Sequence, residues 1–361
     1  MTSSVHIIGS RGSGGAERFF ARLVNALRQA GHQAHAVCPP NSAVAHMLAD
    51  TVQPAEIRMR GNWDILARHQ IKQTINNIAP DIVQTYMGRA TRLTHLPSNR
   101  RPIHIARLGG YYKLKAYRHA HAWVGNTKGI CEHLINGGFP ADRVFFIGNF
   151  IDPSTPSNPA LSQELRENMG IPADAWCLLS VGRLHPNKGF PDLLDAMSLL
   201  PRTIADRPLH LIVVGDGPLR DSLHKHSSRP ELAGRVHWTG WQNDPGPYYD
   251  MTDIFICPSR HEPLGNVILE AWNHKRPVIS TSTLGANELI TSGKNGILVP
   301  IQTPNAIASA IQELLNAPKQ TREALCENGH QSLIRHHSPE AVINAYLHLY
   351  ENLSSADICA V

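Results

Sequence analysis

Short runs of aliphatic and β-branched residues alternate with amphipathic stretches along the whole chain. In the first half these runs predict strands near residues 5–9, 34–38, 81–86, 103–108, 122–125 and 144–147. The second half repeats the pattern, with strands predicted near 177–182, 209–215, 235–238, 254–257, 277–280 and 297–299. Strands that alternate with helical stretches predict parallel sheets covered by helices, so the expected fold class is α/β.

A stretch rich in Pro and Ser, residues 152–159, separates the two halves and predicts a linker. The length of 361 residues is enough for two domains, each with its own core. We therefore expect two doubly wound domains, with a cleft between the carboxyl edges of their sheets. Apolar positions at helical spacing predict a last helix over Glu340–Leu353. The expected division is 1–151 for the first domain, 152–160 for the linker and 161–339 for the second domain.

The composition, with 42% hydrophobic and 17% charged residues, is typical of a folded soluble protein. No apolar run approaches the ~18 residues that span a bilayer, and the chain enters a strand-like segment at Val5 without a signal peptide. We expect a cytoplasmic location. The six cysteines lack CxxC spacing, which predicts reduced, mostly buried thiols rather than disulfides or a zinc site.

The net charge of +5 is unevenly distributed. Residues 1–150 contain 18 Lys and Arg against 7 Asp and Glu, and residues 82–131 contain nine basic residues and no acid. Because Tyr and Trp are interleaved with these cations, the segment suits anionic lipid headgroups or a phosphorylated acceptor. An ordinary solvated surface explains it as well. A nucleic-acid partner is not expected, since no binding motif accompanies the charge.

Two glutamates, Glu262 and Glu270, stand eight positions apart in the segment EPLGNVILE. Pro263 and Gly265 place the first in a loop and the second two turns into a helix. In a continuous helix the pair would be ~12 Å apart along the axis, too far to share one small group. Backbone N–H groups at the helix start suit a phosphate between them, at Gly265, Asn266 and Val267. A nucleotide diphosphate sugar has this layout, although one loop carboxylate and one solvated helix carboxylate explain the pair equally well.

Two cations, Arg183 and Lys188, follow the first predicted strand of the second half, beside glycines that permit a tight turn. A planar guanidinium and a compact ammonium can clamp a diphosphate and stabilise the charge of a leaving group. An exposed pair without a ligand is the alternative. The next two strands end in glycine turns that could wall a nucleotide pocket, at Gly215 and at Gly240-Trp241-Gln242.

A glycine-rich turn, Gly9–Gly15, follows the first strand and leads into a helix predicted to end near Ala30. Such turns let the backbone approach a ligand closely, and the helix start favours an anion. The dinucleotide fingerprint is incomplete, because Glu17 stands where the third glycine belongs. A P-loop is excluded, since no Gly-Lys-Ser/Thr follows. A tight turn without a ligand stays possible.

Six motifs occur in order along the chain: GGAER (14–18), GNFID (148–152), VGRL…NKG (181–189), VGDGP (214–218), CPSRHEPLGNVILEA (257–271) and NGILVP (295–300). In this order they resemble the GT4 family of retaining glycosyltransferases, whose fold is GT-B. The resemblance spans nearly the whole chain, and the Glu-x7-Glu element with its upstream Arg/Lys pair is the most specific part. It implies two Rossmann-like domains that face each other across a cleft, with residues 340–361 returning to the first domain. It also implies a reaction without metal or other cofactor.

The resemblance implies a role for each matching residue. Arg183 and Lys188 would hold the donor diphosphate, Glu262 the donor sugar and Glu270 the ribose hydroxyls. The base would lie near Gly215, Trp241 and Gln242. The loop at Gly14 and Gly15 would close over the donor, and backbone groups would meet the sugar and phosphates at Leu264, Gly265, Asn266 and Val267.

The chain departs from the family where many relatives carry a His-Gly pair after the fourth strand of the first domain, because Gly109 occupies the histidine position. Candidates to replace that histidine are His104, Arg107, Tyr111 and His119, and packing or solvation explains each of them as well. We expect the basic segment to meet an acceptor or a membrane, through Arg107, Tyr111, Lys113 and Lys115.

The resemblance implies a retaining, metal-independent hexosyltransferase, and together with the basic first half it predicts a location on the inner face of the cytoplasmic membrane. Its donor would be a nucleotide-diphosphate sugar, most readily a UDP-sugar. Its acceptor would be a hydroxyl of a bacterial cell-surface glycan or glycolipid precursor such as lipopolysaccharide. One alternative is a non-catalytic protein that binds nucleotide sugars. Another is a different enzyme on this fold, although the glutamate pair argues against an epimerase and the chain length against a phosphorylase.

Overall fold

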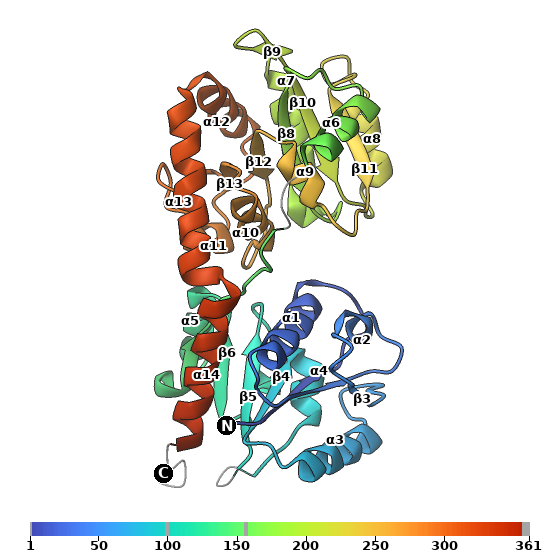
Figure 1. The fold of residues 1–361 in the computed structure, drawn as a ribbon, viewed down its shortest axis with the longest axis vertical. Coiled ribbons are helices and arrows are strands. Elements are labelled where there is room, and N and C mark those ends of the chain that lie inside the picture. The colour runs from blue at the N-terminus through green and yellow to red at the C-terminus, as the bar shows by residue number, and fades with distance from the viewer. Residues whose placement is uncertain (1, 98–100, 155–157, 356–361) are drawn as a thin grey trace. The chain divides into compact units, whose positions relative to one another are not determined.

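A computed structural model describes residues 2–97, 101–154 and 158–355, drawn as a ribbon in Figure 1. The chain forms two compact units. The first unit comprises Met1–Asp152 with His336–Val361, and the second comprises Pro153–Arg335. The predicted linker at 152–160 is too long, because helix α6 (Pro159–Asn168) begins inside it, capped by the Asn158 side chain that accepts from the Leu161 N–H at 3.3 Å. Residues 155–157 of that linker lie outside the described residues.

The first unit is built on a seven-stranded parallel sheet with the order β3-β2-β1-β4-β5-β6-β7. Its strands are β1 (Ser4–Ile8), β2 (Ala34–Cys38), β3 (Ala55–Glu56), β4 (Ile82–Tyr86), β5 (Ile103–Leu108), β6 (Ala122–Gly125) and β7 (Val144–Phe146). The strand order reverses between β1 and β4. The central strands β1, β4 and β5 are buried throughout, as expected for a sheet with helices on both faces.

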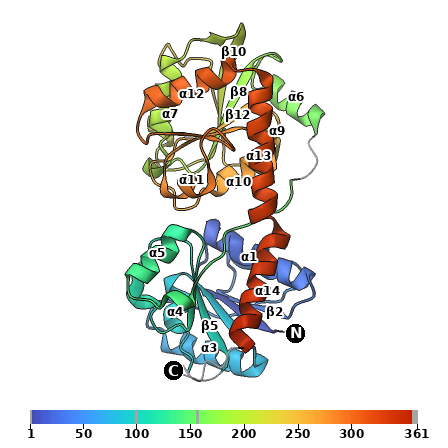
Figure 2. The same ribbon diagram turned by 90° about the vertical axis from the view of Figure 1, so that its left-hand side faces the viewer.

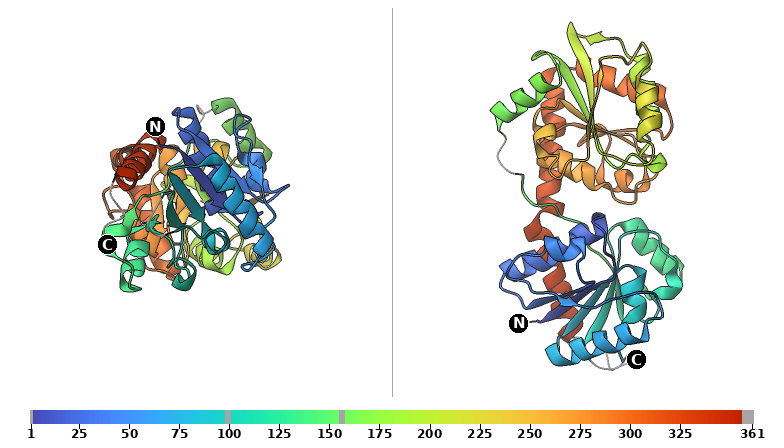
Figure 3. Two further views of the ribbon diagram at one scale, coloured as in Figure 1. Left: turned by 90° about the horizontal axis from the view of Figure 1, so that it is seen from below. Right: turned by 90° about the vertical axis from the view of Figure 1, so that its right-hand side faces the viewer.

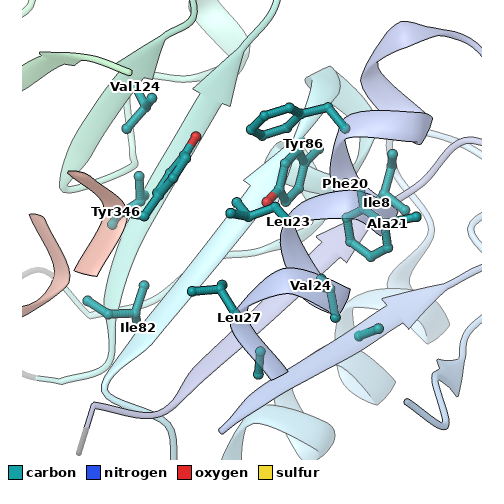
Figure 4. Packing of buried hydrophobic residues seen from close by; sticks show 14 of the residues in the cluster. Ile8, Phe20, Ala21, Leu23, Val24, Leu27, Ile82, Tyr86, Val124 and Tyr346 are labelled. Atoms are coloured by element: carbon teal, nitrogen blue, oxygen red, sulfur yellow. The ribbon is translucent and has the colours of Figure 1, made fainter. Parts of the chain in front are cut away.

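The helices of the first unit are α1 (Gly15–Gln29), α2 (Ala43–Met47), α3 (Ile65–Ile78), α4 (Met87–Leu93), α5 (Lys128–Asn136) and the last helix, α14 (Pro339–Ser355). Apolar side chains of α1, the sheet and α14 share one core, part of which is shown in Figure 4. The Tyr350 hydroxyl of α14 donates to the Gln84 side chain at 2.9 Å, and Tyr346 lies 6.3 Å from Phe19, centroid to centroid. The predicted return of the last helix to the first unit is therefore confirmed.

The second unit contains the strand order β11-β10-β8-β12-β13-β14, with the short β9 paired antiparallel to β10. Its strands are β8 (Trp176–Val181), β9 (Thr203–Ile204), β10 (Arg207–Val214), β11 (Val236–Gly240), β12 (Ile254–Cys257), β13 (Val278–Thr281) and β14 (Ile297–Val299). Besides α6, its helices are α7 (Phe190–Leu199), α8 (Arg220–Ser227), α9 (Gly246–Asp250), α10 (Asn266–Asn273), α11 (Leu284–Leu289), α12 (Pro304–Asn316) and α13 (Lys319–His337), the last of which ends beyond the boundary between the units. Figure 2 shows α7 and α12 side by side, where both contribute to the core of this unit.

The α/β fold class is confirmed, with the strands of each unit lying between helices (Figure 3). Each predicted strand is present, whereas β3 and β9 were not predicted because two residues carry no pattern. Four of the five described cysteines are buried and none of these five forms a disulfide, as predicted, while Cys359 lies outside the described residues. Within the described ranges, no helix has the length and apolarity needed to cross a bilayer.

Candidate active site

The carboxyl ends of β10, β8 and β12 lie next to one another at one edge of the second sheet, because these strands are parallel neighbours. The chain order reverses at this point, since β10 pairs with one side of β8 and β12 with the other. Ligands of open α/β sheets bind at such switch points. The loops that follow these three strands, 182–189, 215–219 and 258–265, therefore frame the candidate site.

Lys188 and Glu262 meet at this switch point. The Lys188 Nζ donates to Glu262 Oε2, and the side chains are 26% and 14% exposed. The backbone forces this meeting, because Gly189 adopts φ 66° and a Cβ there would lie 1.9 Å from the Pro258 carbonyl oxygen. Only glycine lets the loop after β8 approach the loop after β12 so closely. Two residues predicted from separate motifs thus form one ion pair.

Electrostatics keeps Lys188 charged in this position. Burial alone would lower the pKa of its ammonium group, but the adjacent Glu262 carboxylate raises that pKa above its ordinary value. The pair therefore offers a fixed cation and a fixed carboxylate, both mostly covered by protein, at the switch point of the sheet. Such a pair can bind an anionic group through the ammonium and a hydroxyl through the carboxylate.

Arg183 does not join this pair. Its side chain is exposed, and no hydrogen bond or ion pair engages it among the described residues. Gly215 brings the loop after β10 against the loop after β8, since it adopts φ 143° and a Cβ there would lie 2.0 Å from the Gly182 carbonyl oxygen. The structure thus places Arg183 and Gly215 at the predicted edge without a direct side-chain contact to Lys188.

The segment after β11 lies at the same edge of the sheet, because β11 is a parallel neighbour of β10. Trp241 is 53% exposed and its indole N–H donates to Asn243 Oδ1 at 3.2 Å. Gln242 donates from its amide to the Thr239 carbonyl at 3.0 Å, inside its own turn. An exposed indole face of this kind is available to stack on a planar ring.

The prediction that Glu270 lies two turns into its helix is wrong by one turn. Gly265 adopts φ 87° outside the helix, so α10 begins at Asn266 and Glu270 is its fifth residue. The first turn carries the N–H groups of Asn266 and Val267, which have no carbonyl one turn earlier in the helix. Leu264, just before it, is buried. That these N–H groups face a phosphate stays a prediction. Glu270 lies one turn closer to them than the sequence predicted.

Glu270 has a buried partner that the sequence did not indicate. The Tyr249 hydroxyl, at the end of the short helix α9, donates to Glu270 Oε2 at 3.2 Å. The Tyr249 ring stacks on His274 at 5.2 Å between centroids, and His274 Nδ1 lies 2.7 Å from Asp250 Oδ1. No motif spacing links α9 to α10, so only the tertiary fold reveals this arrangement.

A second unpredicted contact fixes the loop that carries Glu262. Arg260 makes a two-pronged ion pair with Asp192 in the first turn of α7, at 2.7 and 2.6 Å. The Arg260 and His261 N–H groups also donate to the Asn187 carbonyl, at 2.8 and 3.1 Å. These bonds join the loops of Lys188 and Glu262. A cation two residues before Glu262 was a sequence signal that could have identified Arg260.

In the first unit, the predicted anion site at the start of α1 is occupied by the chain itself. Gly14 precedes the helix, and the buried Glu17 carboxylate accepts from the Ser10 hydroxyl within the glycine-rich turn. A Cβ at Gly14 would lie 2.9 Å from Glu17 Oε2. The carboxylate already lies at the helix start where an anion is favoured, and Gly14 leaves room for it. The donor contact of Gly14 and Gly15 stays a prediction.

The assignment of Arg107 to an acceptor or membrane surface is wrong. Arg107 lies on β5 and is 2% exposed, with its guanidinium 3.7 Å from the centre of the Phe19 ring. Its Nε donates to the Tyr346 hydroxyl at 3.0 Å, and an Nη donates to Asn149 Oδ1. Buried in this way, Arg107 joins β5 to α14 and cannot meet a membrane. Tyr111, Lys113 and Lys115 are exposed, as their predicted roles require.

The candidates for the missing histidine are also engaged elsewhere. His104 is fully buried and contacts Thr85 Oγ1 at 2.9 Å, while His119 Nε2 lies 2.8 Å from the Thr91 carbonyl. Gly109 has room for a side chain, because a Cβ would meet nothing closer than Arg107 Nη1 and Asn126 Nδ2 at 3.7 Å. The loop thus tolerates a histidine that the sequence does not supply.

Known proteins match the chain along most of its length. The family model described as Glycosyltransferase Family 4 matches residues 13–155, and that described as Glycosyl transferases group 1 matches residues 176–317. The chain is 35% identical over 339 residues to the lipopolysaccharide core biosynthesis glycosyltransferase LpsE of Rhizobium meliloti, covering 93% of this chain and 95% of that protein. It is 30% identical over 341 residues to LpsD of the same organism, covering 94% and 95%.

Solved structures share the fold. Anabaena Alr3699/HepE in complex with UDP superposes with a TM-score of 0.83 at 21% identity, covering 98% of this chain and 100% of that chain. WaaG, a glycosyltransferase involved in lipopolysaccharide biosynthesis, superposes with a TM-score of 0.69 at 17% identity, covering 94% and 99%.

Proposed function

The chain belongs to family 4 of the group 1 glycosyltransferases and has their GT-B fold, and from that premise we propose that it is a retaining hexosyltransferase that uses a UDP-sugar. The observation that carries the proposal is the Lys188–Glu262 ion pair at the switch point of the second sheet. A fixed ammonium beside a fixed carboxylate supplies one group for a diphosphate and one for sugar hydroxyls, which are the two polar parts of such a donor.

Each residue of the second unit takes a distinct part in this proposal. Lys188 binds the diphosphate and stabilises the negative charge that develops as the glycosidic bond breaks. Arg183, exposed and unpaired in the described structure, closes on the diphosphate from the same loop. Glu262 orients the sugar hydroxyls. Glu270, held by Tyr249, accepts hydrogen bonds from the ribose, and Trp241 stacks on the base.

Departure of the sugar from the diphosphate and attack by the acceptor occur on the same face, with a diphosphate oxygen taking the acceptor proton. This assignment accounts for retention without a protein nucleophile. No metal has a part in the proposal, because Lys188 and Arg183 supply the positive charge that a metal would otherwise bring.

The proposed acceptor is a hydroxyl of a lipopolysaccharide core precursor at the inner face of the cytoplasmic membrane. This part is supported by LpsE and LpsD, whose names state lipopolysaccharide core biosynthesis. The proposed UDP-sugar donor is supported by HepE, whose structures hold UDP and UDP-glucose.

A donor panel tests the proposal. UDP-, GDP- and ADP-sugars are incubated with the protein, with and without a glycolipid extract, and released nucleotide is measured together with the anomeric configuration of the product. We expect acceptor-dependent release of UDP and a retained configuration. Lys188→Ala and Glu262→Ala should each lower turnover by about a hundredfold or more, whereas the exposed Lys225→Ala and Glu313→Ala serve as matched controls. Near-normal turnover in either site variant contradicts the assignment.

Donor binding without release under every acceptor condition would support the non-catalytic alternative. That alternative has one observation in its favour, namely Gly109 in place of the family histidine. An inverted product would refute the retaining mechanism while leaving the transferase activity intact.

A further inference from the structure

The three most exposed large apolar side chains of the described chain lie within four residues of one another. They are Trp63, Ile65 and Leu66, at 80%, 81% and 67% exposure, and we call them the α3 tip. The tip spans the turn before α3 and the first two residues of that helix, which lies along the rim of the first unit in Figure 1. Single exposed apolar residues are ordinary, but a cluster of three marks an interaction surface.

The tip is a built structure rather than a frayed end. Asp64 caps α3, with Oδ1 accepting from the Ala67 N–H and Oδ2 accepting from the Arg60 N–H, both at 3.0 Å. These bonds fold the segment 60–67 around one carboxylate and leave the side chains on either side of it facing solvent. The same bonds lower the pKa of Asp64, beginning with the one from Ala67, so the only acid of the segment is committed to the cap.

Cations surround the tip. Arg58 and Arg60 precede it and are exposed, and no ion pair engages them among the described residues. Lys72 lies seven residues after Ile65, on the same face of α3, and is exposed as well. Residues 57–80 contain four basic residues and one acid, Asp64.

We propose that the α3 tip docks the protein on an anionic lipid bilayer, with Trp63, Ile65 and Leu66 entering the interface and Arg58, Arg60 and Lys72 contacting the headgroups. Trp prefers the interface, aliphatic side chains enter the acyl boundary, and cations are attracted to anionic lipid. A second copy of the chain fits less well, because two such tips would bring like charges together. Nucleic acid fits less well, since Ile65 and Leu66 offer nothing to a phosphate backbone.

The segment that leads to the tip contacts the carboxyl edge of the first sheet. Arg89 donates to the carbonyls of Gly9, which follows β1, and of Met59, which leads to the tip, at 3.1 and 3.3 Å. The inference deepens the proposed function and rests on its lipid-linked acceptor, but docking itself requires neither donor nor acceptor.

Vesicle co-sedimentation tests the proposal with the full chain. Vesicles of phosphatidylcholine alone are compared with vesicles holding about 30% phosphatidylglycerol, at low and at high salt. We expect binding to the anionic vesicles only, weakened by salt. Changing all three tip residues to Ser should lower the bound fraction about tenfold, while Arg58→Gln with Arg60→Gln should lower it and flatten its salt dependence. Leu199→Ser, an exposed apolar residue of the second unit, is the matched control and should bind like the wild type.

A second pair, Lys113→Gln with Lys115→Gln, separates the tip from the basic segment at 82–131 and should leave binding nearly unchanged. The proposal is overturned if the tip variant binds like the wild type, or if the Lys113/Lys115 variant alone loses binding. It is also overturned if the wild type does not bind anionic vesicles. A dimer in light scattering that the tip variant disperses would then identify a second copy of the chain as the partner of the tip. UDP release, measured separately on detergent-solubilised acceptor, reports on the proposed function, so the two can fail independently.

Discussion

Lys188 and Glu262, 74 positions apart in the sequence, form an ion pair where the loops after β8 and β12 meet. Removing one partner leaves a partly buried charge without its counterion, whereas removing both does not. We therefore expect Lys188→Met and Glu262→Gln each to destabilise the second unit. The double variant should lose less free energy of unfolding than the sum of the two single losses. A double-mutant cycle on urea unfolding should yield a coupling of about 1–2 kcal/mol.

The pH dependence of that pair has a defined sign. Because the folded-state pKa of Lys188 is raised above 10.5, its contribution is complete below that pH and is lost as the pH rises through the folded-state pKa. Wild-type stability should thus decline above about pH 10.5 more steeply than that of Lys188→Met. Equal slopes in the two proteins would contradict the pairing in solution.

Gly189 and Gly109 make a matched pair of glycines for a test of backbone constraint. Gly189 combines φ 66° with a virtual Cβ 1.9 Å from the Pro258 oxygen, whereas Gly109 has no neighbour within 3.7 Å of such an atom. Gly189→Ala should lower the free energy of unfolding by about 2–4 kcal/mol, and Gly109→Ala by less than about 0.5 kcal/mol. Thermal unfolding of both variants checks the prediction, and comparable losses would contradict it.

Arg107 should matter for stability, not for membrane binding. Arg107→Met removes the donors to Tyr346 and Asn149, and leaves both acceptors buried beside α14. We expect the free energy of unfolding to fall by about 2–3 kcal/mol, because two buried hydrogen bonds from a charged donor are lost. Lys113→Met, at an exposed position, should change stability by less than about 0.5 kcal/mol. Vesicle binding by Arg107→Met at a temperature where it is folded should match the wild type.

The sheets, and the placement of Lys188 and Glu262 at one edge of the second sheet, were predictable because both depend on local patterns. Buried parallel strands are continuous apolar runs, and residues that follow neighbouring strands meet at one edge. The prediction that Arg107 lies on the surface was wrong because it, too, relied on a local pattern. A basic residue in a basic segment was assigned to the surface, although it lies on a central strand where both faces are covered.

The remaining site contacts depend on geometry that no local pattern encodes. The helix start at Asn266 is set by the left-handed Gly265, so Glu270 moves one turn nearer the edge. Tyr249 reaches Glu270 only because α9 lies beside α10, and Lys188 is paired with Glu262 while the neighbouring Arg183 is exposed. Side-chain direction within a loop is decided by tertiary packing rather than by the identity of the residue.

A cluster of histidines in the first unit predicts sensitivity to acid. Burial, and then the neighbouring His119, His121 and His95, lower the pKa of His104 well below 6.5. Facing charges are basic as well, with Arg68 near His95 and Arg143 near His121, and these add to the lowering. The folded state thus favours neutral histidines, while the unfolded chain takes up protons from about pH 6.5 downward.

Stability should therefore fall as the pH drops from 6.5 toward the folded-state pKa values, by roughly 1–3 kcal/mol between pH 7.5 and 5. His104→Gln keeps a donor toward Thr85 but cannot titrate, so it should remove part of this slope. His69→Gln, at an exposed histidine of α3, should leave the slope unchanged. Urea unfolding at several pH values measures this dependence of stability on pH. An unaltered slope in His104→Gln would contradict the contribution of His104 to it.

Tyr249 should act on donor affinity through Glu270. Tyr249→Phe keeps the buried ring stacked on His274 and removes the hydroxyl, which lies 3.2 Å from Glu270 Oε2 and 3.4 Å from the Val267 carbonyl oxygen. If Glu270 binds the ribose, loss of this hydrogen bond to its carboxylate should raise the KM for the donor about threefold to tenfold, with kcat within about twofold. A donor with 2′-deoxyribose provides the control, because it lacks one of the hydroxyls that Glu270 would accept from. The increase in KM on changing to that analogue should be smaller in Tyr249→Phe than in the wild type. Equal increases would show that Tyr249 does not act through the ribose contact.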